Sequence, residues 1–282
     1  MRNDPEVREA VASFDFGFTH QSSRRAGEWL GRSTGSSVEF QDYREYTPGD
    51  DVRHLDWAAY ARSNSLMVRM YRDEISPRTE VILDASRSMA SGKEKSRLAI
   101  QLATALTQIS TRLGGQPVVH CVSDEPSVPL SVSELDLLDD LPFNGLQPLV
   151  EVATQRVLPL RHQSVRLVIS DFLFPHDPDR LIRVLARDAA ALWLIQVLDP
   201  FEADPESLGG RRLRDIETDE QIDIFLDEAS VTEYRRRLSD LQQHLARSCR
   251  RAGGTLATIT SSQAMLSACA NQLCECGLLT PT

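Results

Sequence analysis

From residue 79 to the C-terminus, short continuous apolar runs alternate with longer segments that have the apolar spacing of a helix. Val81-Ile82-Leu83 is such a run, as expected for a strand that is covered on both faces. The segment after it has an apolar stripe at three- and four-residue steps, which predicts a helix that ends at Gly114-Gly115. The stripe consists of Leu98, Leu102, Leu106, Ile109 and Leu113. Strands that alternate with helices of this length predict an α/β fold with a mostly parallel central sheet flanked by helices.

The same patterns locate the other elements of this region. Capping boxes at Ser91-Gly92-Lys93-Glu94 and Ser230-Val231-Thr232-Glu233 predict the starts of two helices. A polar turn at residues 217–220, between residues 211–216 and 222–226, predicts a β-hairpin. Further strands are expected at residues 118–122, 128–132, 167–169, 192–198 and 256–259, and further helices at residues 149–158, 181–190 and 264–273.

Residues 1–77 have a different character. They are polar, rich in Arg, Ser and Gly, and show no regular alternation of helices and strands. Strands are expected at residues 37–46 and 66–71, with a turn at Tyr46-Thr47-Pro48-Gly49-Asp50-Asp51 between them. We therefore expect a smaller N-terminal segment, residues 1–77, ahead of an α/β domain at residues 78–282.

The charge balance limits the classes of partner. The chain has 41 Asp and Glu against 31 Lys and Arg, a formal net charge of -10. Nucleic acid and anionic membrane surfaces repel a net anion, so neither is expected as the main partner. The longest apolar run, residues 189–198, is too short for a membrane span, and the polar N-terminus lacks the apolar stretch of a signal peptide. These features predict a cytoplasmic protein, in which the five cysteines stay reduced.

A short loop after the first buried strand carries three oxygen-bearing side chains. Asp84, Ser86 and Ser88 offer one carboxylate and two hydroxyls, which suit Mg²⁺, Mn²⁺ or Ca²⁺ and not zinc. Asp171 follows the strand expected at residues 167–169, and ligands of parallel sheets bind beyond the carboxyl ends of the strands. We therefore expect Asp171 to join this site, either as a direct metal ligand or from a greater distance.

Catalytic motifs fit the chain less well. Ser91-Gly92-Lys93 is similar to part of a phosphate-binding loop, but Arg87 stands where that motif needs a glycine. The chain has no Gly-x-Ser-x-Gly elbow of a serine hydrolase. Asp84 could act as an aspartyl nucleophile, but Ser86 stands where phosphatases of the haloacid dehalogenase type have their acid/base aspartate.

Two stretches resemble known sequences. The string Asp84-Ala85-Ser86-Arg87-Ser88-Met89 resembles the metal-ion-dependent adhesion site of von Willebrand factor A domains. A longer stretch upstream resembles the signature of the bacterial family called domain of unknown function 58, in which the signature precedes an A-type domain. The matching residues are Gly35, Val38-Glu39-Phe40, Tyr43-Arg44-Glu45-Tyr46, Pro48-Gly49-Asp50-Asp51, Arg53, Asp56-Trp57 and Ala61-Arg62.

The resemblance implies a von Willebrand factor A-like fold and partnership with MoxR-type AAA+ ATPases. The metal-site positions that carry over are Asp84, Ser86, Ser88 and Asp171. The family's middle-loop threonine has no counterpart in Asn144-Gly145-Leu146-Gln147-Pro148, where the main-chain carbonyl of Gln147 is the substitute candidate.

The resulting hypothesis is a non-enzymatic adaptor or scaffold. It would bind Mg²⁺, or Mn²⁺ or Ca²⁺, and dock on a MoxR-type AAA+ ATPase or on the client protein of that ATPase. Two alternatives stay open: a metal-dependent hydrolase that uses Asp84, and a structural A-type domain whose loop holds no metal.

Overall fold

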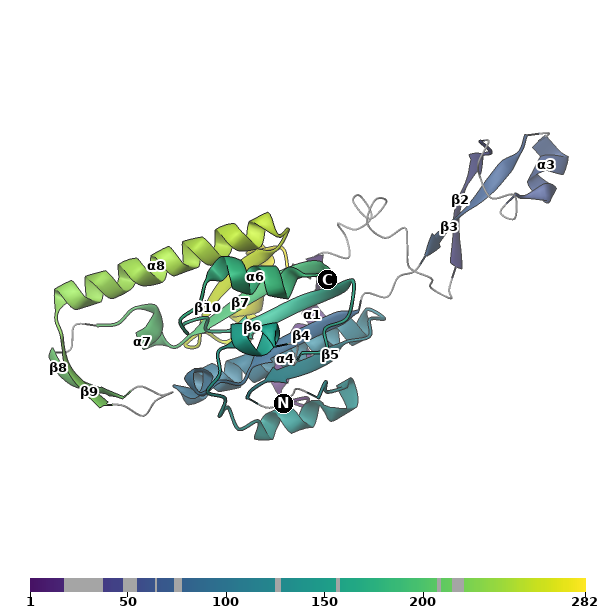
Figure 1. Ribbon diagram of the computed structural model, residues 1–282. Helices are drawn as coiled ribbons and strands as arrows, with labels where there is room; N and C mark the ends of the chain where they lie inside the picture. The colour runs from purple at the N-terminus through teal and green to yellow at the C-terminus, as the bar shows by residue number, and fades with distance from the viewer. Residues whose placement is uncertain are drawn as a thin grey trace. The chain divides into compact units, whose positions relative to one another are not determined.

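The computed structural model divides the chain into two compact units (Figure 1). One unit combines Met1–His20 with Pro77–Thr282, and the other is Gln21–Ser76. The structure describes residues 1–17, 38–47, 55–63, 65–73, 78–124, 128–155, 158–206, 209–214 and 221–282.

A parallel five-stranded sheet forms the centre of the larger unit. Its strand order is β10-β7-β6-β4-β5, and every neighbouring pair is parallel. The strands are β4 (Thr79–Asp84), β5 (Val118–Val122), β6 (Ser164–Ser170), β7 (Ala189–Leu198) and β10 (Thr255–Thr260). Strands β4 and β6 are buried along their whole length, because helices cover both faces of the sheet. The expected α/β class with a mostly parallel sheet is confirmed.

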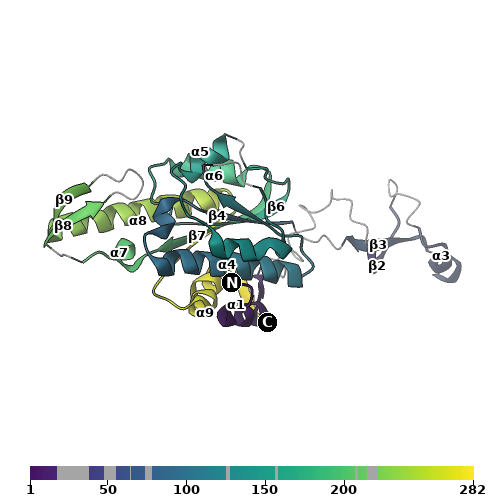
Figure 2. The same ribbon diagram turned by 90° about the horizontal axis from the view of Figure 1, so that it is seen from below.

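Two helical layers cover the sheet (Figure 2). Helices α4 and α9 lie on one side of the sheet, with α1 packed against both of them, and α5, α6 and α8 lie on the other side. Alternate residues of β4 point into the two cores: Val81 and Leu83 pack with Leu102 of α4, whereas Ile82 packs with Leu181 of α6. The helices are α1 (Pro5–Ser13), α4 (Lys93–Arg112), α5 (Leu149–Thr154), α6 (Pro178–Ala186), α7 (Pro200–Ala203), α8 (Glu228–Arg251) and α9 (Met265–Ala268).

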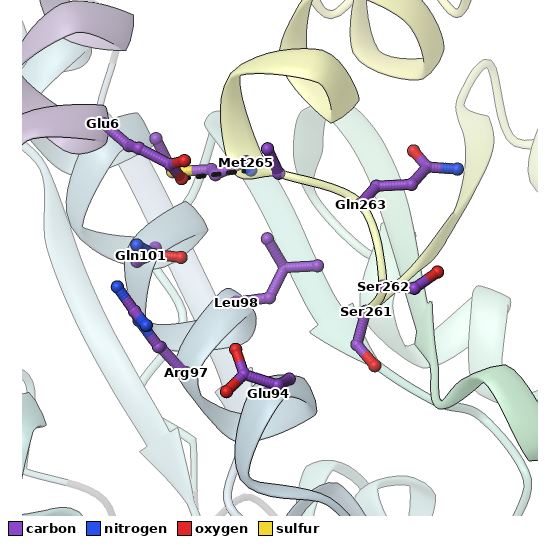
Figure 3. A pocket seen from close by; sticks show the side chains of 10 residues that line it. Glu6, Glu94, Arg97, Leu98, Gln101, Ser261, Ser262, Gln263 and Met265 are labelled. Atoms are coloured by element: carbon purple, nitrogen blue, oxygen red, sulfur yellow. Dashed lines mark hydrogen bonds between the residues drawn. The ribbon is translucent and has the colours of Figure 1, made fainter.

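The first residues of the chain belong to the larger unit, which differs from the expected division into residues 1–77 and 78–282. Val7 and Ala10 of α1 are fully buried against the core, and β1 (Phe14–Phe16) pairs antiparallel with β11 (Leu279–Pro281). The Glu6 carboxylate accepts a hydrogen bond of 3.2 Å from the main-chain N–H of Met265 (Figure 3). A polar composition concealed the short amphipathic stretch that makes these contacts.

The smaller unit contains the two strands expected from the sequence. β2 (Val38–Glu45) and β3 (Met67–Asp73) form an antiparallel pair, and α3 (Trp57–Ser63) lies between them in the chain. Of the expected turn at residues 46–51, residues 48–51 lie outside the described residues.

Several element ends differ from the expected ones. Helix α4 has Gly92 as its N-cap, because the Ser91 hydroxyl donates instead to the carboxylate of Glu202, at 3.1 Å. Helix α8 begins two residues before the expected cap, since the Asp227 side chain accepts from the N–H of Ser230. The edge strand expected at residues 128–132 is reduced to a single bridge between Val119 and Leu130.

The remaining short elements complete the larger unit. Helix α5 ends earlier than expected, and the C-terminal helix changes after α9 into a π-helical turn, η4 (Cys269–Leu273). The expected hairpin is confirmed as β8 (Gly209–Arg214) and β9 (Gln221–Leu226). The 3₁₀ segments are η2 (Arg87–Ala90) and η3 (Val132–Asp140). No helix in the described ranges combines the length and apolar character needed to cross a membrane.

Candidate metal centre

Two aspartates lie at the carboxyl ends of neighbouring strands. Asp84 is the last residue of β4, and Asp171 directly follows β6, which pairs with β4 in parallel register. Both side chains are buried, Asp84 at 1% and Asp171 at 0% exposure. The sheet therefore brings together two carboxylates that are far apart in the sequence.

The Asp84 carboxylate is oriented by two hydrogen bonds. Its Oδ1 accepts from the main-chain N–H of Ser86 at 2.9 Å, and its Oδ2 accepts from the hydroxyl of Ser170 at 2.6 Å. Burial and the negative charge of Asp171 raise the pKa of Asp84 to about 6, although these hydrogen bonds act in the opposite direction. The raised pKa means that burial and the neighbouring carboxylate disfavour the ionised form of Asp84.

The two serine hydroxyls lie beside this carboxylate. Ser86 Oγ and Ser88 Oγ share a hydrogen bond of 3.1 Å, and the Ser86 side chain also hydrogen-bonds to Asp84. Ser86 is buried and is the N-cap of η2, so the turn after β4 sets the positions of both hydroxyls. Asp84, Ser86 and Ser88 thus form the compact group of hard oxygen atoms that was expected.

Asp171 is engaged by a lysine that sequence reasoning missed. Lys95 Nζ donates to Asp171 Oδ2 at 2.8 Å, to the Glu202 carboxylate at 2.7 Å, and to the main-chain carbonyl of Ser88 at 3.0 Å. The Lys95 side chain is fully buried. The sequence contained a signal for its burial. The apolar stripe of α4 includes Leu98, and three residues before Leu98 the same face of the helix carries Lys95.

The charges around the loop favour a divalent cation. Asp84, Asp171 and Glu202 contribute three carboxylates, and Lys95 contributes one ammonium group. With Asp84 ionised, two negative charges stay unbalanced in a buried environment, where unpaired charge is costly. The donor set and the charge both fit Mg²⁺ or a similar hard dication at Asp84, Ser86 and Ser88.

The middle loop approaches the metal loop through Gly145. Its N–H donates to the Ala85 carbonyl at 3.1 Å, and its carbonyl accepts from the Arg87 N–H at 2.9 Å. A Cβ at Gly145 would lie 3.2 Å from Cα of Ser123, so the position favours glycine. Gln147 is exposed, and its main-chain N–H donates to the carboxylate of Asp124 at 2.7 Å.

Two further features lie apart from this loop. Asp177, Asp179 and His244 have the residue types of a metal site, but Asp177 caps α6 and Asp179 already accepts from the Ser248 hydroxyl. A cavity of about 250 Å³ lies between α1, α4 and the segment after β10 (Figure 3). Its lining residues are Glu6, Glu94, Arg97, Leu98, Gln101 and residues 261–265, and they include no residue of the metal loop.

Comparison with known proteins identifies relatives over most of the chain. Proteins of Mycobacterium bovis and Mycobacterium tuberculosis, both described as uncharacterized, are 28% identical over 252 residues, which cover 84% of this chain and 79% of theirs. Two solved structures are similar at 13% identity: the conserved hypothetical protein BatB of Bacteroides thetaiotaomicron, with a TM-score of 0.40, and an aerotolerance-related membrane protein of Bacteroides fragilis, with a TM-score of 0.42. The match covers 71% of this chain and 98% of each of those chains.

The family model described as "Protein of unknown function DUF58" matches residues 42–244. The matched range includes the second half of β2, all of β3, the metal loop and most of α8. It exceeds half of the 282 residues, and so the chain belongs to the DUF58 family.

Proposed function

We propose that this protein is a non-catalytic binding module that captures a protein partner through a divalent cation held by Asp84, Ser86 and Ser88. The observation that supports the proposal most directly is the buried Asp84 carboxylate, which lies beside two serine hydroxyls and a second carboxylate. In the described residues, Asp84 forms no ion pair with a lysine, arginine or histidine. We propose as well that the larger unit is a von Willebrand factor A-like domain.

The chemistry of the cation suggests what it would capture. Mg²⁺ prefers six oxygen ligands and retains water where the protein supplies few of them. One carboxylate and two hydroxyls therefore leave coordination positions that exchange with solvent. A carboxylate of a partner protein is the natural hard ligand for such a position.

The partner to test first is a MoxR-type AAA+ ATPase or its client protein. This choice follows from the family resemblance of the 35–62 stretch. Such a partner would place the protein in the cytoplasm.

The metal can be tested by titrating Mg²⁺ and Mn²⁺ into the protein in a calorimeter. We expect one site in the wild type and a loss of affinity of about tenfold or more in Asp84→Asn, which removes the negative charge of the main ligand. Asp177→Asn is the matched control, since Asp177 belongs to the exposed acidic cluster and asparagine is also a good N-cap. Loss in Asp177→Asn with retention in Asp84→Asn would move the metal to the other cluster.

The partner step has its own test. Binding to the purified ATPase should weaken on chelation with EDTA and in Asp84→Asn, while the circular dichroism spectrum stays the same. A complex that survives both treatments would exclude a cation bridge. Hydrolysis of p-nitrophenyl phosphate that depends on Asp84 would instead favour the hydrolase alternative.

A further inference from the structure

The Lys95 ammonium group is buried beside the metal loop. A lysine is almost never fully buried unless it is paired, and here two carboxylates and one carbonyl surround the amine. Lys95 lies in the first turn of α4, only a few residues after the loop itself. Its position gives one of the two strand-end aspartates a permanent cation.

We propose that Lys95 determines which ligand the metal site selects, by holding Asp171 as an ion-pair partner and keeping it out of direct coordination. This inference rests on the proposed function. The divalent cation would then have Asp84 as its single carboxylate ligand, so the cation together with its direct ligands would keep one positive charge, while the remaining negative charge of the cluster stays on Glu202 beside Lys95. That positive charge makes an anionic side chain, and not a neutral one, the preferred group at the open position.

The charge on the bound cation explains why it matters whether Asp171 pairs with Lys95 or binds the cation. A dication with one carboxylate is still an electrophile, whereas a dication with two carboxylates is electrically neutral. In a buried site this difference is large, because Coulomb interactions are weakly screened there. Without Lys95, Asp171 would be an ionised carboxylate next to the cation and would bind it.

The other contacts of Lys95 keep it in place. Glu202 accepts from Lys95 and, through Oε2, from the main-chain N–H of Asp199 at 2.8 Å. The main-chain carbonyl of Glu202 accepts from the Tyr234 hydroxyl at 2.6 Å. The capping box of α7 and the Tyr234 side chain of α8 therefore hold Glu202 in place. Because Glu202 holds Lys95 in turn, the Lys95 ammonium group stays next to Asp171.

The test uses Mn²⁺ alone as the probe, with the signal of free aquated Mn²⁺ followed by electron paramagnetic resonance. Four proteins are compared: wild type, Lys95→Met, Asp171→Asn and the double variant. We expect Lys95→Met to bind Mn²⁺ about tenfold tighter or more, since Asp171 becomes a ligand. Asp171→Asn should bind more weakly than wild type, because one negative charge is lost beside the cation and only Glu202 is left to balance Lys95. The double variant removes one charge of each sign and should return close to the wild-type affinity.

Two controls protect the interpretation. Lys93→Met removes the same charge from an exposed position two residues away and should leave the Mn²⁺ affinity within about twofold, because an exposed charge is strongly screened. Thermal melting reports folding: Lys95→Met should melt lower than wild type without metal and recover with Mn²⁺. In the double variant neither residue 95 nor residue 171 carries a charge, so neither is left as an ion without its partner. The double variant can therefore still be measured if Lys95→Met does not fold.

The outcomes separate this inference from the proposed function. A double variant that loses Mn²⁺ as severely as Asp84→Asn would make Asp171 a direct ligand in the wild type, and the inference would be overturned. An unchanged affinity in Lys95→Met would overturn it as well, while leaving the metal site intact. If neither the wild type nor Lys95→Met binds Mn²⁺, the metal site itself fails, and the inference fails with it.

Discussion

Individual buried side chains illustrate how this protein accommodates charge in its core. Glu80, in strand β4 of the five-stranded sheet, is fully buried with Arg166 and His120. Burial alone would raise the pKa of Glu80, but hydrogen bonds from His120, from Ser164 and from the Arg161 N–H outweigh it and lower the pKa below its ordinary value. A strand interior can therefore hold an ionised carboxylate when every lone pair has a donor.

The lowered pKa of Glu80 predicts a pH-dependent contribution to stability. A carboxyl whose pKa is lower in the folded state stabilises the fold above its unfolded-state pKa, and the stabilisation is lost as the pH falls through the folded value. At pH 7, Glu80→Gln should lower the free energy of unfolding by about 3–5 kcal/mol, since it leaves Arg166 buried without its partner. In urea titrations the difference from wild type should shrink below the ordinary glutamate range. The same loss in the exposed control Glu9→Gln would contradict this explanation.

At the scale of secondary-structure elements, the residue at which a helix begins depends on whether the expected capping side chain makes its hydrogen bond within the helix or with a distant part of the fold. Both helices expected to begin at a capping box begin at another residue. In α4, the Ser91 hydroxyl contacts Glu202, which lies more than a hundred residues away in the chain. In α8, an aspartate three residues before the expected cap is the acceptor, and its pKa is lowered by the hydrogen bonds from Ser230.

The cap of α8 can be tested with two alanine variants. Asp227→Ala should lower the free energy of unfolding by about 1 kcal/mol, because the N–H of Ser230 loses its acceptor. Ser230→Ala should have a smaller effect than Asp227→Ala, because it removes only the hydroxyl donor and keeps the hydrogen bond from the main-chain N–H to Asp227. Chemical denaturation followed by circular dichroism gives both values. The reverse order of the two effects would restore the capping box as the start of the helix.

At the scale of the whole molecule, the chain ends close the larger unit. β1 and β11 pair with each other, and α1 packs on α4 and α9. The smaller unit is thus an insertion between β1 and β4 of the larger one. Residues at the start of the chain should therefore contribute to the stability of a sheet that begins at residue 79.

Phe16 provides the test of this arrangement. Its side chain is 1% exposed within the core that includes β4 and α4, so Phe16→Ala should destabilise the larger unit by about 3–5 kcal/mol. Phe201→Ala removes an equal volume from a side chain that is 41% exposed and serves as the control, with an expected change of less than about 1 kcal/mol. Urea unfolding is followed by fluorescence in a Trp29→Phe/Trp57→Phe background, in which Trp193 is the remaining tryptophan and reports on this unit. Equal, small effects of both substitutions would mean that residues 1–17 fold apart from the sheet.

The sequence by itself determined the fold class and the position of Asp84. Both follow from short-range patterns: Val81-Ile82-Leu83 must be a strand buried on both faces, and a polar loop before an amphipathic helix must lie at the carboxyl end of that strand. The hairpin at β8 and β9 and the strands β2 and β3 were predictable for the same reason.

Tertiary structure alone decided which charges meet at the site. Lys95, Asp171 and Glu202 lie on α4, after β6 and on α7, and only the order of β4, β6 and β7 in the sheet brings the Lys95 ammonium group within 3 Å of both carboxylates. The position of Asp171 at the edge of the sheet could be predicted from the sequence. Its ion pair with Lys95 could not, because the residues near Lys95 in the sequence do not show which distant carboxylate will lie beside it. Electrostatic pairing acts through space, and strand order, which no local periodicity specifies, sets the distances.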